Sequence, residues 1–368
     1  MASTMNPPPL ECIGCRREFD VRELAWRCPC GGLLDVAGTW KPALAPGVDD
    51  TSLWRYQSVL PVERDASISL GEGGTPTVRS RSLPGINLKL EFLSPTLSFK
   101  DRGAVVLATL AASIGVESVL VDSSGNAGLA AAAYFGRAGV RCEVMVPAST
   151  SQAKVAQIRA YGATVTAVPG NRADTSAAAV RRADSGDIFY ASHVYHPYFL
   201  HGVKTYGYEI WESNGRTLPS AVIVPVGNGT MLLGCHLAFT ELVAAGFADR
   251  LPAIVAVQAQ NCAPLAAAFA DDADDISPGE VGSTVAEGIA ISEPPRSKQI
   301  LAAIRSTGGS IITVSDDEIL AARTRLALEG LFVEPTASAC FAAAMSTGSA
   351  LPTEDDVVVA LCGAGSRG

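Results

Sequence analysis

One lysine stands where a turn leads into an alanine-rich helical run. The stretch Ser94–Gly103 reads SPTLSFKDRG, so a Pro-Thr turn precedes Lys100 and Asp-Arg-Gly follows it. A lysine amine is a nucleophile toward carbonyl compounds, and an apolar environment lowers its pKa and leaves a neutral fraction near pH 7. Most lysines are simply exposed charges at a helix start. Taken alone, Lys100 therefore fits either role.

Two turns connect a strand to a helix and can bind anions. Asp122–Gly128 reads DSSGNAG, and Val226–Gly234 reads VGNGTMLLG. Backbone N–H groups that converge at a helix N-terminus suit a carboxylate or a phosphate. Each turn by itself is also typical of an ordinary strand-to-helix connection. The second turn lacks the Lys-Ser/Thr of a P-loop and does not meet the GxGxxG spacing, so as a lone pattern it is a weak signal.

Four cysteines are concentrated near the N-terminus. Cys12 and Cys15 are separated by two residues, twelve residues follow, and Cys28 and Cys30 are separated by one proline. Four thiolates can surround Zn²⁺ tetrahedrally and hold a segment that is too short to form a core. The Cys-x-Cys pair is tighter than the usual Cys-x2-Cys, and free or redox-active thiols are the alternative. The spacing favours a structural zinc site.

The elements that must position these groups alternate between strands and helices. Strands are expected at 118–122, 142–146, 164–168, 221–226, 254–258, 311–314 and 357–361, and helices at 127–138, 151–161, 175–182, 231–245 and 316–329. This alternation implies right-handed βαβ units and parallel sheets. The strands are nearly continuous apolar runs, as expected when both faces of a sheet are covered. The sequence therefore predicts an α/β protein with two sheets.

Composition excludes several classes of partner. A net charge of −9 disfavours nucleic acids and anionic membranes, which require basic patches. No run of about 18 apolar residues predicts a membrane span. The N-terminus lacks the pattern of a secretory signal, and the nine unevenly spaced cysteines fit reduced thiols in the cytoplasm. The remaining partner is a small molecule.

These motifs, in this order, resemble the threonine synthase-like group of fold-type II enzymes that depend on pyridoxal phosphate (PLP). The stretch around Lys100 matches the PTGSFKDRG motif of that group, with Leu97 in place of the usual glycine. Supporting segments are LGEGGTP at 70–76, AEGIAI at 286–291 and EPTAS at 334–338. The resemblance covers the chain from about Leu70 to the C-terminus. Many threonine synthases also carry an N-terminal cysteine knuckle.

The resemblance implies the fold of tryptophan synthase β, with two parallel-sheet, three-layer domains and the small N-terminal cysteine knuckle. The expected domains are a zinc-ribbon-like segment at 1–40, a large PLP domain at 41–102 and 209–368, and a small domain at 103–208. The cofactor is expected between the large and small domains. A homodimer is usual among similar proteins.

The resemblance also implies roles for individual residues. Lys100 is expected to bond to the cofactor and to act in catalysis, and Asn126 to contact the cofactor ring. Cys362 is expected at the pyridine nitrogen, where threonine synthases carry a threonine. The cofactor phosphate is expected on Gly227, Asn228, Gly229, Thr230 and Met231, and the substrate on Ser123, Ser124, Ala127 and Thr75. Cys12, Cys15, Cys28 and Cys30 are the expected metal ligands.

One segment departs from the family pattern. His193–Glu209 reads HVYHPYFLHGVKTYGYE, which places Phe199 where threonine synthases use an arginine to hold the phosphate of O-phosphohomoserine. An apolar ring cannot replace a bidentate guanidinium. His196 and His201 are the candidates to compensate, and each is otherwise an ordinary polar residue.

Three functions remain open at this stage. The leading prediction is threonine synthase, which converts O-phosphohomoserine and water to threonine and phosphate, or a close relative. The second is a serine/threonine dehydratase-type ammonia-lyase, which Cys362 and Phe199 favour. The third is a non-catalytic PLP-binding regulatory protein. The intact Lys100, Asn126 and glycine turn disfavour this third possibility.

Overall fold

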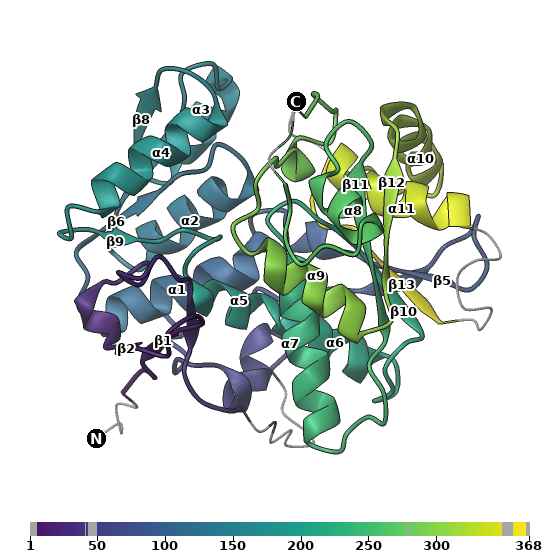
Figure 1. Cartoon of the computed structure of the whole chain (residues 1–368), viewed down its shortest axis with the longest axis horizontal. Coiled ribbons are helices and arrows are strands. Elements are labelled where there is room, and N and C mark those ends of the chain that lie inside the picture. The colour runs from purple at the N-terminus through teal and green to yellow at the C-terminus, as the bar shows by residue number, and fades with distance from the viewer. Residues whose placement is uncertain are drawn as a thin grey trace. The chain divides into compact units, whose positions relative to one another are not determined.

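The structure is a computed structural model that describes residues 6–40, 42, 50–277, 279, 281–347 and 356–365. The chain forms two compact units (Figure 1). Unit 1 consists of Met1–Gly73 and Lys100–Val203, and unit 2 of Gly74–Phe99 and Lys204–Gly368. The domain boundaries expected from the sequence stay a prediction, and Lys41, at the first of them, lies outside the described residues.

Unit 1 begins with a small antiparallel sheet in the order β2-β1-β3. Its elements are β1 (Leu10–Cys12), β2 (Glu18–Phe19), the 3₁₀ helix η1 (Val21–Glu23) and β3 (Leu34–Val36), and a second 3₁₀ helix, η2 (Leu53–Val59), follows. Strands of two or three residues cannot enclose a core of their own. Trp26 instead joins the core of unit 1 and contacts Tyr190 and Tyr195 edge to face, at centroid distances of 5.6 and 5.0 Å.

The main sheet of unit 1 has four parallel strands in the order β8-β7-β6-β9. They are β6 (Ser118–Val121), β7 (Arg141–Pro147), β8 (Thr164–Val168) and β9 (Phe189–Tyr190). The helices of this unit are α1 (Lys100–Ser113), α2 (Asn126–Arg137), α3 (Gln152–Ala160), α4 (Arg172–Ala183) and α5 (Pro197–Val203).

Helices cover both faces of this sheet. Successive side chains of a strand point to opposite faces. On β7, Met145 packs with Ala179 of α4, whereas Val144 lies beneath Gly128 of α2. Helix α2 in turn packs against α1 and α3. Unit 1 therefore has helix, sheet and helix layers.

Unit 2 contains a six-stranded sheet in the order β12-β11-β10-β13-β5-β4. All neighbouring strands are parallel except β4 and β5. The strands are β4 (Thr77–Arg79), β5 (Ile86–Lys89), β10 (Ala221–Pro225), β11 (Ala253–Ala259), β12 (Ser310–Val314) and β13 (Val357–Ala360). The helical elements are η3 (Glu91–Leu93), α6 (Thr205–Ser213), α7 (Thr230–Ala244), α8 (Pro264–Ala270), η4 (Glu287–Ile289), α9 (Ser297–Ser306), α10 (Asp316–Leu328) and α11 (Pro335–Thr347).

The central strands of unit 2 are buried on both sides. Helix α11 packs against β10 to β13, while α7 and α9 also pack against central strands and against each other. The side chains of β10 are buried throughout, which explains the uninterrupted apolar run. The predicted α/β class, the parallel sheets and the predicted strands and helices are confirmed. Among the described residues, no helix is long and apolar enough to cross a bilayer.

A buried ion pair joins α6 to α7 in unit 2. Lys204 Nζ, which is fully buried, lies 2.7 Å from Glu241 Oε1. The Tyr208 hydroxyl donates to Glu241 Oε2 at 2.5 Å. Burial lowers the pKa of Lys204 to about 8, and burial also raises the pKa of Glu241. Each charge is therefore costly without its partner.

We expect Lys204→Ala to lower the free energy of unfolding by about 3–5 kcal/mol, because it leaves the Glu241 carboxylate buried without its cation. The matched control is Arg141→Ala, which removes one half of the exposed Arg141–Glu117 pair. Exposed pairs contribute little, so the control should stay close to the parent protein. Urea denaturation measures both variants. Equal midpoints for the two would contradict the prediction.

Candidate active site

Lys100 is the first residue of α1 and is half-buried. Its Nζ lies 5.7 Å from the centroid of the Phe199 ring. The same ring packs on the backbone of Gly103, where any Cβ would overlap it. The glycine of the Lys-Asp-Arg-Gly motif is thus required by the close packing of α5 on α1. As a result, the lysine amine lies beside an aromatic face.

The residue that departs from the lysine motif, Leu97, adopts a left-handed backbone conformation, with φ of 65°. Only glycine enters this region without a steric cost, which for other residues is about 1–2 kcal/mol. The conformation is fixed by hydrogen bonds on both sides. Leu97 N donates to Ser94 O at 2.8 Å, and Ala364 N donates to Leu97 O at 3.0 Å. The turn before Lys100 therefore keeps its shape despite the leucine.

The turn between β6 and α2 has the form expected of an anion-binding turn. Asn126 begins α2, and its N-cap, Gly125, makes no side-chain capping bond. Gly128 is obligatory, because a Cβ there would overlap the carbonyl of Ser123. Gly125 N donates to Ser123 Oγ at 3.3 Å. This bond uses an acceptor site on the hydroxyl, so Ser123 keeps its proton for donation.

The turn between β10 and α7 fits a phosphate. Gly229 has φ of 76° and caps the 15-residue helix α7 without a side-chain capping bond. A Cβ on Gly227 would come 2.9 Å from Gly288 O, and one on Gly229 would overlap Ile300. The turn is thus held by close backbone packing, and the first amides of α7 meet no capping side chain. Amides of this kind, with the helix dipole behind them, bind a phosphate group.

The end of β13 places Cys362 next to a carboxylate. Cys362 is buried, and its Sγ donates to Glu334 Oε1 at 3.6 Å. Gly363 is also covered by Glu334, since a Cβ there would come 2.5 Å from the same oxygen. The sequence predicted a neutral thiol at this position. The structure adds a carboxylate, that of Glu334 in the segment 334–338, which accepts a hydrogen bond from this thiol.

Thr75 belongs to a buried polar cluster in unit 2. Its hydroxyl donates to Glu91 Oε1 at 2.5 Å and accepts from Lys89 Nζ at 2.6 Å. Lys89 Nζ also lies 2.8 Å from Glu209 Oε2, and Gly74 N donates to Glu209 Oε1 at 2.7 Å. The one proton of the Thr75 hydroxyl is thus already used. Thr75 can therefore serve a substrate only as an acceptor or as a wall.

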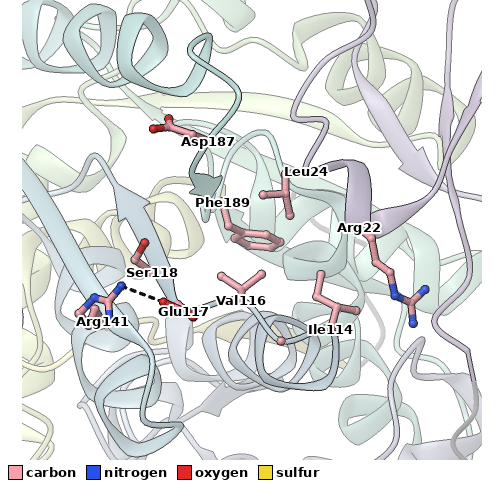
Figure 2. Close-up of a pocket in the computed structure, with 10 residues that line it drawn as sticks. Arg22, Leu24, Ile114, Val116, Glu117, Ser118, Arg141, Asp187 and Phe189 are labelled. Atoms are coloured by element: carbon pink, nitrogen blue, oxygen red, sulfur yellow. Dashed lines mark hydrogen bonds and ion pairs between the residues drawn. The ribbon is translucent and has the colours of Figure 1, made fainter.

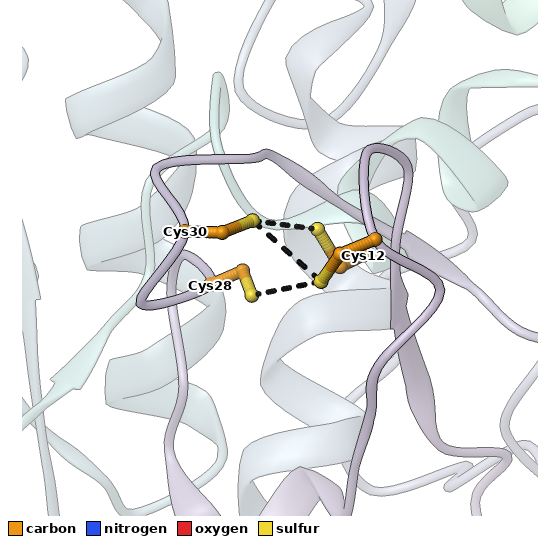
Figure 3. A group of neighbouring side chains, drawn as sticks. Cys12, Cys28 and Cys30 are labelled. Atoms are coloured by element: carbon orange, nitrogen blue, oxygen red, sulfur yellow. Dashed lines mark hydrogen bonds between the residues drawn. The ribbon is translucent and has the colours of Figure 1, made fainter.

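The four N-terminal cysteines meet in unit 1 (Figure 3). Their sulfur atoms all lie within 4.8 Å of one another, and three pairs are 3.5 to 3.6 Å apart. Tetrahedral zinc with Zn–S bonds of about 2.3 Å separates its sulfurs by roughly 3.8 Å. The observed distances fit that arrangement, so the tight Cys-x-Cys pair does not prevent it. The cluster contains Cys12, Cys15, Cys28 and Cys30.

The histidines predicted to compensate for Phe199 lie in aromatic surroundings. His196 lies 5.0 Å from Phe189 and 5.6 Å from Tyr198, measured between ring centroids. His201 lies edge-on to Trp40 at 5.4 Å. A third histidine, His193, lies 5.9 Å from Phe199 between ring centroids. Sequence reasoning did not single out His193, because its place beside α1 depends on how the segment before α5 folds back.

A cavity of about 400 Å³ opens at the amino ends of the strands of the unit 1 sheet, opposite the end that carries the Asn126 turn (Figure 2). Leu24, Ile114, Val116 and Phe189 surround it, and the Glu117–Arg141 ion pair lies at its side. It lies by the first residues of β6, β7 and β9. The turn that carries Asn126 follows the last residue of β6. The cavity is therefore separate from the candidate site, and the sequence did not predict it.

Each unit thus brings part of the predicted set together. Unit 1 joins Lys100, Phe199 and His193, and it holds the Asn126 turn at the end of β6. Unit 2 packs the turn at 227–229 against the segment 286–291. It also places Cys362 beside Glu334. The residues present fit PLP: a half-buried lysine at a helix start and a glycine turn at the start of a 15-residue helix.

Comparison with known proteins gives the same family. The family described as "Pyridoxal-phosphate dependent enzyme" matches residues 68–363. The chain is 37% identical to the threonine synthases of Methanosarcina acetivorans and Methanocaldococcus jannaschii, over 90% of this chain and 85% of each relative. It is 35% identical to the threonine synthase of Mycobacterium leprae, over 78% of this chain and 79% of the relative.

Solved structures of similar proteins share the fold. A PLP-dependent aspartate racemase aligns with a TM-score of 0.69 at 25% identity, over 79% of this chain and 90% of that one. A threonine deaminase from T.th. aligns with a TM-score of 0.68 at 27% identity, over 80% of this chain and 93% of that one. Maize serine racemase aligns with a TM-score of 0.68 at 20% identity, over 79% of this chain and 88% of that one. At this identity the likeness shows the fold alone.

The left-handed backbone at Leu97 gives a testable difference between two truncations. We expect Leu97→Gly to be more stable than Leu97→Ala by about 1 kcal/mol, because both remove the side chain but only glycine accepts the positive φ. At Leu320, which is partly exposed inside α10, alanine should instead be more stable than glycine by about 1 kcal/mol. Denaturant unfolding of the four variants measures both differences. The same sign at both positions would contradict the strain at Leu97.

Proposed function

Because this chain belongs to the PLP-dependent enzyme family, in which it is a threonine synthase-like lyase, we propose that it converts O-phosphohomoserine and water to threonine and phosphate. The observation that carries the proposal is the identity of 37% with two threonine synthases over 90% of this chain and 85% of theirs. Sequence identity over nearly the whole length of this chain and of each relative favours a shared reaction over a shared fold alone. The ordered motifs around Lys100, Asn126 and Gly227 support the same reading.

We propose that the following residues bind the cofactor. Lys100 holds it through Nζ, and Asn126 contacts its ring. Gly227, Asn228, Gly229, Thr230 and Met231 bind its phosphate, because the uncapped start of α7 supplies amides and a helix dipole. Cys362 approaches the ring nitrogen, with Glu334 as the acceptor of its proton. Bound PLP supplies an electron-withdrawing ring that stabilises negative charge at the Cα atom of an amino acid.

The chain's own groups bind the substrate and move its protons. Ser123, Ser124 and Ala127 border the substrate carboxylate at the start of α2, where backbone amides favour an anion. Thr75 forms a wall of the site, since its proton is given to Glu91. The Lys100 amine would act as the base that takes the proton from the substrate Cα. The aromatic face of Phe199 beside Nζ limits the access of water to that amine.

A second candidate is an ammonia-lyase of the serine/threonine dehydratase type. The observation that favours it is the Phe199 ring, which packs on Gly103 beside Lys100 where threonine synthases carry a phosphate-binding arginine. Such an enzyme would eliminate water from serine or threonine, and hydrolysis of the resulting imine by water would give ammonia and a 2-oxo acid. Cys362 favours the same class, because the thiol at this place resembles that of the dehydratases.

The covalent assignment of Lys100 predicts a labelled residue. Purified protein with PLP should absorb in the visible range, and borohydride should fix the cofactor to Lys100 as a mass increment on the peptide that contains it. Lys100→Ala should abolish the label and turnover. Lys154, on α3 of unit 1, is the matched control, and Lys154→Ala should keep both. A label on another lysine would overturn the assignment.

The substrate is decided by the products. Holoenzyme incubated separately with O-phosphohomoserine, threonine and serine should release phosphate and form threonine from the first alone. Formation of a 2-oxo acid from threonine or serine would instead establish the ammonia-lyase of the dehydratase type. If the enzyme turns over none of the three compounds while the label on Lys100 is intact, both activities are contradicted.

We also propose that Cys12, Cys15, Cys28 and Cys30 hold one structural zinc ion. The support is the mutual distance of the four sulfurs, which fits tetrahedral thiolate ligation. We also propose a cytoplasmic location, which nine cysteines without a disulfide among them support. A homodimer is inferred from the family resemblance, and light scattering after size exclusion tests it.

Zinc removal should destabilise unit 1. Metal analysis of purified protein should give about one zinc ion per chain, and Cys28→Ser should lose it because three thiolates bind zinc more weakly than four. The melting temperature should fall on chelation, because bound metal stabilises only the folded segment. Cys262→Ala, in unit 2, is the control and should retain zinc. A parent protein free of zinc that melts unchanged with added zinc would reject the site.

A further inference from the structure

His193 carries a buried ring nitrogen that has no hydrogen-bond partner. The residue is 6% exposed, and its Nδ1 lies among the buried polar atoms without a partner in the described part of the chain. Buried polar atoms in folded proteins are nearly always hydrogen-bonded, so an unpaired one requires an explanation. A ligand that approaches this nitrogen supplies the missing bond.

The position of His193 joins it to the reacting lysine. Its ring lies 5.9 Å from the Phe199 ring, and Lys100 Nζ lies 5.7 Å from the same ring. His193 follows β9, as Asn126 follows β6, and these two strands are neighbours in the sheet. Because the two strands are parallel, both residues follow the carboxyl ends of their strands and lie at the same end of the sheet. His193 thus belongs to the side of unit 1 that carries the candidate site.

The charges that act on His193 are positive. Burial lowers its pKa well below the usual value, and the cations of Lys100 on α1 and Arg172 on α4 lower it further. Arg172 is the first residue of α4, and its side chain is exposed. A neutral imidazole in a positive field is a poor site for a cation and a good one for an anion. An anion that binds there offsets the field and restores the basicity of the ring.

We propose that His193 Nδ1 donates a hydrogen bond to the phosphate of the substrate, with Arg172 supplying positive charge. Together they take over the task of the guanidinium that is missing at Phe199. The inference rests on the proposed function and names the group that binds its leaving phosphate. A hydrogen bond to a charged oxygen is stronger than a neutral one, so a single buried donor has a measurable effect on binding.

The proposal assigns His193 to binding, so its variants should raise KM more than they lower kcat. In His193→Leu, KM for O-phosphohomoserine should rise about tenfold or more, because a charge-assisted hydrogen bond is lost. Inorganic phosphate should inhibit the holoenzyme competitively, and its inhibition constant should rise by a similar factor. Arg172→Gln should act in the same direction. His236→Asn, in unit 2, is the matched control and should change neither constant.

A conservative variant separates binding from a structural role. His193→Asn retains a donor but cannot take up a proton, so it should recover part of the affinity for phosphate. In the parent enzyme the affinity should fall as pH rises through the pKa of the bound state, because phosphate binding favours the protonated ring. In His193→Asn this part of the pH dependence should disappear. Borohydride labelling of Lys100 in each variant verifies that the cofactor site has folded.

The outcomes are distinct from those that test the reaction. If the parent holoenzyme does not turn over O-phosphohomoserine but binds inorganic phosphate, and His193→Leu loses that binding, the subsite stands and the proposed reaction fails. If His193→Leu keeps its cofactor and its inhibition by phosphate is unchanged, the subsite is overturned. A parent holoenzyme that does not bind inorganic phosphate overturns it as well.

Discussion

The close approach of backbone to backbone at strand-to-helix turns is the constraint on which both units depend. Gly128 must admit the carbonyl of Ser123, and Gly227 must admit the segment at 286–291. A side chain at either position would separate the strand end from the helix start. The amides at these helix starts can bind a carboxylate or a phosphate only if this spacing is kept. The glycines thus permit the close packing that the proposed anion sites also require.

The segment that precedes and forms α5 lies between the N-terminal residues and Lys100. The Tyr198 hydroxyl donates to Pro8 O at 2.5 Å, and Trp26 packs on Tyr195. On its other side, Phe199 covers Gly103 and lies beside Lys100. The same short segment therefore contacts the N-terminal residues through Tyr195 and Tyr198 and helix α1 through Phe199.

Local patterns were enough for the fold class and for the parts of the site that lie on one turn. Apolar runs of four to six residues, separated by helical segments, predicted the parallel strands from 118 onward. Short elements were missed: β9 has two residues, and β4 and β5 lack a long apolar run. The sequence pattern assigned Thr75 to the substrate site but gave no indication of its hydrogen-bond partners. Lys89, Glu91 and Glu209 come from distant positions, and no local pattern brings them together.

The sequence by itself determined the cofactor family, because a lysine motif, two glycine turns and their order along the chain are local and specific. It also determined that four cysteines are available, although their spacing left open whether the sulfurs meet. Only the tertiary structure decided that they do, and that the ring of His193 lies 5.9 Å from the ring of Phe199. The physical reason is that side chains distant in sequence meet only after helices and strands have packed. Burial then sets which polar atoms lack partners and which charges act on them.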